Sequence, residues 1–111
     1  MAIPHAQPGE LIDVRPLGSA LPGAQTTTLV KADGLEVIRL VVPAGREIKT
    51  HTAPGPMTLQ CVEGRVAFTT MGRTLDLSAG QMVHLASGEA HALRGVEDSS
   101  LLLTLVLKQN A

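Results

Sequence analysis

Aromatic side chains are almost absent from this sequence. Phe68 is the only one in 111 residues, and the chain has neither tryptophan nor tyrosine. Proteins that hold single-stranded nucleic acids stack the bases on aromatic side chains, so this class of function is disfavoured. The same deficit weakens the case for a sugar site. A pocket in this protein must therefore be built from aliphatic and methionine side chains.

The sequence also has little cysteine and almost no net charge. Cys61 is the only cysteine, so no intrachain disulfide can form, which excludes a disulfide-stapled scaffold and is compatible with a reducing compartment. Nine Lys and Arg stand against ten Asp and Glu, for a formal net charge of −1. The basic residues are scattered, so we expect neither nucleic acid nor an anionic membrane as a partner.

Long hydrophobic runs are missing as well. The longest apolar run, at 101–107, is too short to span a bilayer. The first ten residues lack the basic start and apolar stretch of a signal peptide. We therefore expect a cytoplasmic protein with no membrane partner.

What the sequence does contain is a series of short β-type segments within one domain. Turn signals separate them at a spacing typical of an all-β sandwich or barrel, and Asp33-Gly34 is the strongest hairpin signal. No stretch has a helical period with caps. Residues 1–10 are expected to form a flexible arm. The expected strands are 11–15, 26–33, 35–42, 47–53, 57–62, 65–70, 73–77, 81–85, 91–95 and 100–107.

Two stretches share a layout of glycines and histidines. In the first, residues 45–64, Gly45 precedes His51 by five intervening residues and the stretch ends at Gly64. In the second, residues 80–95, Gly80 is followed by Gly88 and then, after two residues, by His91.

This layout resembles the two motifs of the cupin superfamily, of the RmlC-like type, over roughly residues 30–107. The resemblance implies an all-β, single-domain cupin-type jelly-roll β-barrel over residues 11–111, with motif 1 at 45–64 and motif 2 at 80–95. It also implies a homodimer. The second motif departs from the family pattern, since Ala86 stands where the family has proline and Gly95 where it has asparagine.

The resemblance further implies a site for one divalent transition metal, and two of its four ligand positions are changed. His51 and His91 occupy two positions. Ala53 stands at the second histidine of motif 1 and cannot ligate, while Met57 replaces a glutamate with a soft thioether. The predicted metal site, His51 and His91, is therefore incomplete.

Other side chains are candidates for additional ligands according to their position on the expected strands. Gln60 has the opposite parity to Met57 and is expected to face away from the interior. Cys61 shares the parity of Met57, and a cysteine with two histidines could hold zinc or copper, although a lone buried cysteine is usually core. His84 is expected at an edge or interface, and His5 in solvent. Alternation also places His51 on the opposite face from Ile48.

The leading functional hypothesis is a protein that binds a small organic ligand in the barrel with a weak or absent metal site. The expected pocket residues are His51, His91, Met57, Leu59, Cys61 and Phe68. One alternative is a metal-dependent enzyme, similar to a dioxygenase or an isomerase, that uses the incomplete histidine site. Another is a ligand-sensing regulatory module. Whether the protein is an enzyme stays open, and no catalytic residue is assigned.

Overall fold

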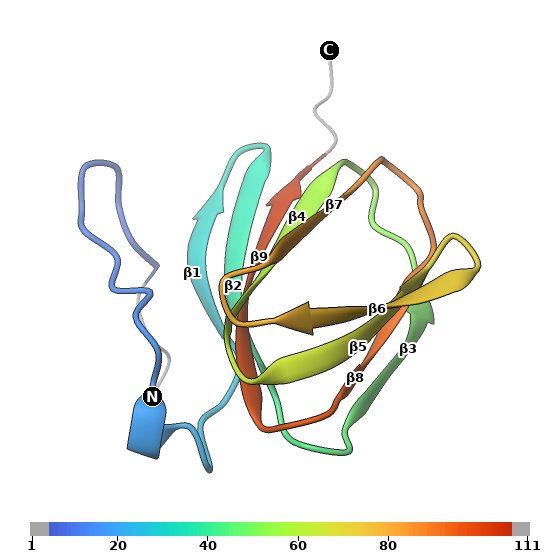
Figure 1. Ribbon diagram of the computed structural model, residues 1–111. Helices are drawn as coiled ribbons and strands as arrows, with labels where there is room; N and C mark the ends of the chain where they lie inside the picture. Colours follow the sequence, from blue (N-terminus) through green and yellow to red (C-terminus); the bar gives the residue numbers. More distant parts are fainter. Residues whose placement is uncertain (1–4, 108–111) are drawn as a thin grey trace.

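The structure, a computed structural model, describes residues 5–107 and consists of two antiparallel sheets that face each other (Figure 1). The five-stranded sheet has the order β1-β2-β9-β4-β7 and the four-stranded sheet the order β3-β8-β5-β6. The elements are the 3-10 turn η1 (Gly18–Ala20) and the strands β1 (Thr27–Ala32), β2 (Leu35–Val42), β3 (Glu47–His51), β4 (Met57–Glu63), β5 (Arg65–Thr70), β6 (Arg73–Ser78), β7 (Met82–Leu85), β8 (His91–Gly95) and β9 (Ser99–Val106).

The all-β prediction is confirmed, but the closed barrel is not shown. Between residues 5 and 107 the ladders form two separate sheets rather than one continuous ring of strands. The hairpin prediction at Asp33-Gly34 is confirmed, because Ala32 pairs with Leu35 and Gly34 has a φ of 78°. No helix in the described part of the chain is long and apolar enough to cross a membrane.

The strand expected at 11–15 is wrong. The backbone there belongs to no ladder, and Leu11 is fully exposed. Asp13 explains the failure, since its Oδ1 accepts a hydrogen bond from the Arg15 backbone N–H at 3.0 Å. Such a local bond bends the chain and competes with strand pairing.

The core lies between the two sheets and follows the alternation of the strands. On β4, Met57, Leu59 and Cys61 are buried, whereas Thr58 and Gln60 alternate with them and are only partly buried. This confirms the outward position of Gln60. The largest fully buried side chains include Phe68, Leu59, Leu101 and Val42.

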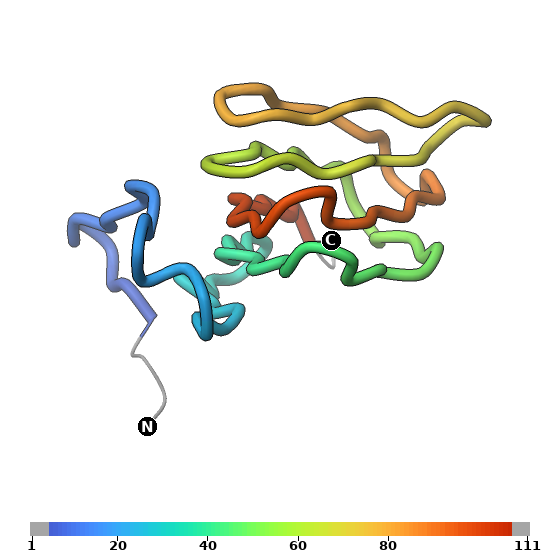
Figure 2. The backbone as a smooth tube through the Cα atoms, turned by 60° about the horizontal axis from the view of Figure 1, so that its bottom comes forward, coloured from blue at the N-terminus to red at the C-terminus, as the bar shows by residue number. Residues whose placement is uncertain are grey.

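The segment before β1 is an irregular arm beside the five-stranded sheet (Figures 1 and 2). The Ala6 N–H donates to the Leu29 carbonyl at 2.8 Å, and the N–H groups of Leu17 and Gly18 donate to the Glu63 carboxylate at 2.8 and 3.0 Å. Irregular chain with the single turn η1 continues to β1, whereas the predicted arm ended at residue 10. Residues 1–4 of that predicted arm lie outside the described residues.

A β-bulge explains how Glu63 reaches the arm. Cys61 pairs with Leu101 and Glu63 with Ser100, so Val62 is an extra residue on β4. Because a bulge shifts the alternation by one, Glu63 leaves the core face that Cys61 occupies and lies on the outer face. Its Oε2 accepts a hydrogen bond from Ser100 Oγ there.

Candidate functional site at the end of the sandwich

His51 and His91 meet at one end of the four-stranded sheet. His51 is the last residue of β3 and His91 the first of β8, and the two are register partners. Their ring centroids are 4.3 Å apart with an interplanar angle of 62°, an edge-to-face contact. The structure therefore brings together two histidines that lie in different motifs of the sequence.

A bulge in β3 makes this contact possible. Ile48 pairs with Leu93 and His51 with His91, so three steps along β3 match two along β8. The prediction that Ile48 and His51 lie on opposite faces of the strand is therefore wrong. The extra residue puts both on the face that carries Leu93 and His91. Leu93 belongs to the core and Ile48 packs against it.

Both rings are oriented by the same kind of hydrogen bond. His51 Nδ1 lies 2.8 Å from the Lys49 carbonyl oxygen, and His91 Nδ1 lies 3.0 Å from the Glu89 carbonyl oxygen. A carbonyl oxygen only accepts, so each Nδ1 carries the proton and donates it. In the neutral ring this leaves the Nε2 lone pair of each histidine free for a ligand.

The two rings differ in exposure. His91 is 5% exposed and stacks on Phe68, with centroids 5.8 Å apart and an interplanar angle of 19°. His51 is exposed. The pair therefore extends from the core, at His91, to the solvent, at His51.

Two loops border the pair and are tied to each other. Residues 52–56 connect His51 to Met57, and residues 86–90 connect Leu85 to His91. Ser87 Oγ donates to the Pro54 carbonyl at 2.7 Å, and the Gly88 N–H donates to the Ala53 carbonyl at 3.0 Å. Thr70 Oγ1 donates to the Ala90 carbonyl at 2.9 Å. These bonds fix the frame around the histidines.

The predicted apolar pocket residues are all in the core. Met57 is 4% exposed and Leu59 1%, and both Cys61 and Phe68 are completely buried. Met57 begins β4, at the histidine end, whereas Cys61 lies four residues further along the strand. The three clefts described for residues 5–107 are lined by other residues. A role of these four side chains in ligand binding stays a prediction.

The donors found here do not fit the four-ligand metal site that the cupin pattern implies. Among residues 5–107 no group of three or more His, Cys, Asp or Glu side chains could hold a metal ion. Ala53 packs against the core and has no side-chain atom that can bind a metal. Cys61 does not join the histidines; its Sγ lies 3.4 Å from the Glu63 carbonyl oxygen, and burial raises the pKa of its thiol.

The other two histidines lie away from the pair. His84 is exposed on β7, an edge strand of the five-stranded sheet, which confirms the predicted edge position. Its Nδ1 lies 3.0 Å from the Met57 carbonyl oxygen. His5 is exposed, as predicted, and lines a cleft beside the arm.

Comparison with family models settles the membership that the two motifs suggested. The Cupin domain model matches residues 38–107. The chain is a cupin. No curated protein matches this cupin.

Solved structures support the fold of this cupin. A conserved protein of unknown function from Streptococcus pyogenes is 24% identical, with a TM-score of 0.75 over 99% of this chain and 97% of the other. A cupin superfamily protein from Desulfitobacterium hafniense is 16% identical, with a TM-score of 0.77 over 93% and 100%. A DMSP lyase from Ruegeria pomeroyi is 23% identical, with a TM-score of 0.66 over 75% and 46%. At these identities the likeness concerns the fold alone.

Sequence reasoning missed one group of polar residues in this cupin. Arg39 and Glu63 both hold the arm from the outer face of the five-stranded sheet. The only sequence signal was an arginine in the middle of an apolar strand, LEVIRLVV. Such a charge is expected to face away from the core, and nothing in the pattern indicated that the arm would cover it.

Proposed function

We propose that this cupin binds a small, weakly polar organic molecule at the end of the sandwich where His51 and His91 meet. The observation that carries the proposal is the matched orientation of the two rings. Each Nδ1 is used by a backbone carbonyl, so both Nε2 atoms stay available on adjacent rings. His84 also bonds a carbonyl through Nδ1, so what distinguishes this pair is that the two rings are in contact.

The chemistry of the pair favours a ligand that donates hydrogen bonds. A neutral imidazole accepts at Nε2, so a hydroxyl, amide or amine N–H of the ligand is the matching group. The interior side of the pair is apolar, since Phe68 stacks on His91 and belongs to the same core cluster as Met57 of the facing sheet. Methionine is unbranched and adapts readily, so Met57 is the side chain expected to move when a ligand enters.

The alternative is a metal-dependent enzyme with only two protein ligands. The ring separation favours it, because two imidazoles at the right angle of an octahedral ion have centres about 4.5 Å apart for a metal–nitrogen length of about 2.1 Å, close to the 4.3 Å observed. Ala53 and Met57 weigh against it, as they leave the rest of the coordination to water or substrate. Metal analysis of untagged protein by inductively coupled plasma mass spectrometry decides it: near one equivalent per chain favours the enzyme.

Ligand binding is tested by a thermal-shift screen of small alcohols, phenols, amides and amines. The best compound is then measured against His51→Gln, His91→Gln and the control His84→Gln. His84 is a fair control because its Nδ1 also bonds a backbone carbonyl, but on the other sheet. We expect stabilisation of wild type and of the control, and its loss in the two site variants. Equal stabilisation of all four proteins would contradict the proposed site.

We also propose that the cupin forms a homodimer through the outer face of the five-stranded sheet. Val106 of β9 and its register partner Leu35 of β2 are 46% and 37% exposed and lie side by side on this sheet. Apolar side chains exposed on one sheet are a common feature of protein interfaces. Light scattering after size exclusion gives the test, with a mass of two chains expected.

A further inference from the structure

Arg39 is a buried arginine on the outer face of the five-stranded sheet. It lies on β2 between Leu40, which packs against the core, and Ile38, so alternation directs it away from the core. Its register partner on β1 is Thr27 and on β9 Leu102. Despite facing outward, Arg39 is only 7% exposed, because the arm covers it.

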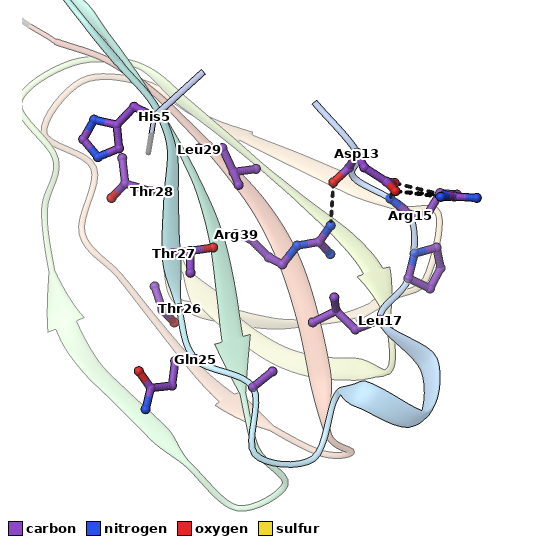
Figure 3. A pocket seen from close by; sticks show the side chains of 12 residues that line it. His5, Asp13, Arg15, Leu17, Gln25, Thr26, Thr27, Thr28, Leu29 and Arg39 are labelled. Atoms are coloured by element: carbon purple, nitrogen blue, oxygen red, sulfur yellow. Dashed lines mark hydrogen bonds and ion pairs between the residues drawn. The ribbon is translucent and has the colours of Figure 1, made fainter. Parts of the chain in front are cut away.

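The guanidinium of Arg39 is only partly satisfied. Its Nη2 donates to the Asp13 carbonyl oxygen at 3.1 Å (Figure 3), while Nη1 is buried without a hydrogen-bond partner among the described residues. Arg39 takes part in none of the ion pairs found within residues 5–107. A buried guanidinium nitrogen normally has a hydrogen-bond partner, so the unpaired Nη1 is a donor left open for an acceptor.

The nearby carboxylates are occupied elsewhere. Asp13 forms an ion pair with Arg15 at 2.7 Å. Glu63 accepts hydrogen bonds from the N–H groups of Leu17 and Gly18 and from Ser100 Oγ. Neither carboxylate is within ion-pair distance of Arg39, so its charge acts on the pKa of both only from further away and the guanidinium has no carboxylate in direct contact.

Arg39 lines a cleft of about 900 Å³ between the arm and strands β1 and β2. Figure 3 shows its guanidinium reaching from β2 towards Asp13 of the arm, with Thr27 and Leu29 alongside. The cleft also has apolar lining, including Leu17, Ala24 and Leu29. Asp13 and Arg15 also line the cleft but pair with each other, so Arg39 is the cation that keeps a free donor. One such cation beside aliphatic side chains matches one carboxylate with a hydrocarbon tail better than a multiply charged phosphate.

We propose that this cleft binds a small aliphatic monocarboxylate, whose oxygens pair with the Arg39 guanidinium. Arginine binds carboxylates through two parallel hydrogen bonds, and the free Nη1 supplies a donor that the arm leaves unused. Thr27, directly across the ladder, is placed to add a hydroxyl. This site lies on the outer face of the five-stranded sheet, so it is separate from the His51–His91 end of the four-stranded sheet.

The test uses hexanoate, its neutral isostere hexanamide and inorganic phosphate, each titrated into the full chain by calorimetry. The variants are Arg39→Met, which keeps length and removes charge, and the control Arg94→Met, an exposed arginine of β8. Hexanoate is expected to saturate one site per wild-type chain. Hexanamide and phosphate, and hexanoate with Arg39→Met, are expected to bind at least about tenfold more weakly. Arg94→Met should match wild type.

A second measurement keeps the proposal falsifiable if Arg39→Met does not fold. In wild type, the Arg39 Nε–H signal in a proton–nitrogen NMR spectrum should shift with hexanoate and not with hexanamide. Equal binding of the two compounds, unchanged binding by a folded Arg39→Met, or no saturable heat up to about 10 mM hexanoate would overturn the proposal. Phosphate binding more tightly than hexanoate would also overturn it. If the protein is a dimer that binds no hexanoate, the cleft is occupied by a second chain, which would likewise overturn the proposal.

Discussion

His51 and His91 touch edge to face, with ring centres 4.3 Å apart, yet one ring is exposed and the other is buried. Both rings use Nδ1 to bond the carbonyl of the residue two positions earlier. The same geometry therefore exists in two environments, and the two histidines should differ in what they contribute to stability while sharing a role in binding.

Substitution of the two histidines separates these contributions. His91→Gln should lower the free energy of unfolding by about 1–3 kcal/mol, because it removes a buried hydrogen bond and the stack on Phe68. His51→Gln should change it by no more than about 0.5 kcal/mol, because the ring is exposed. Urea denaturation measures both. Equal losses would show that burial does not distinguish the two positions.

Glu63 predicts a pH dependence of stability. Burial alone would raise its pKa, but hydrogen bonds from Ser100 Oγ and from the N–H groups of Leu17 and Gly18, together with the charge of Arg39, lower it below 4.5. A carboxyl with a depressed folded-state pKa stabilises the fold above the unfolded-state pKa, and this contribution disappears as pH falls through the folded-state value.

The matched variant for this pH dependence is Glu63→Gln, which is uncharged at every pH. At pH 7 it should be less stable than wild type by about 1–3 kcal/mol, since three donors lose a charged acceptor. The difference should shrink once the pH falls below 4.5. Urea denaturation of both proteins from pH 7 to pH 3 measures it, and a constant difference would contradict the assigned role.

Gly64 occupies a turn that no side chain fits. Its φ is 84°, and a Cβ would lie 2.2 Å from the Asp98 carbonyl oxygen. Gly72 has a similar φ of 78°, but a Cβ at that position would have nothing within 4 Å, so it isolates the backbone effect. Gly72→Ala should cost about 1–2 kcal/mol from the positive φ. Gly64→Ala should cost at least about 2 kcal/mol more from the clash, and equal melting temperatures would contradict the packing described here.

Cys61 should be unreactive in the folded protein. Its side chain is completely buried, and burial raises the pKa of the thiol, so the nucleophilic thiolate is disfavoured. Iodoacetamide should label it at least about a hundredfold more slowly than in urea, because labelling requires opening of the core. The chain has one cysteine, so mass spectrometry follows this reaction without ambiguity. Labelling at the unfolded rate would place Cys61 outside the core.

The fold could be read from the sequence where turn chemistry and alternation acted locally. Asp33-Gly34 marked its hairpin, and Met57, Leu59 and Cys61 alternated into the core as expected. The failures are at irregularities that alternation cannot anticipate. The bulge in β3 moved His51 to the face of Ile48, and the bulge in β4 moved Glu63 outward. At 11–15, the hydrogen bond from the Arg15 N–H to Asp13 bends the chain and competes with strand pairing.

The candidate site could be predicted only in part for the same reason. Motif spacing identified His51 and His91, but their contact depends on a pairing register that the sequence does not state. The arm over Arg39 was invisible to pattern analysis, because it depends on tertiary hydrogen bonds from the N–H groups of Leu17 and Gly18 to Glu63.

The most direct test of the proposed function is NMR of the histidine rings in nitrogen-15-labelled protein, with and without the best compound from the thermal-shift screen. We expect His51 and His91 to carry their proton on Nδ1, and both Nε2 signals to move together on saturation while that of His84 stays. A compound that binds tightly and leaves the Nε2 signals of His51 and His91 unchanged would contradict the proposed site.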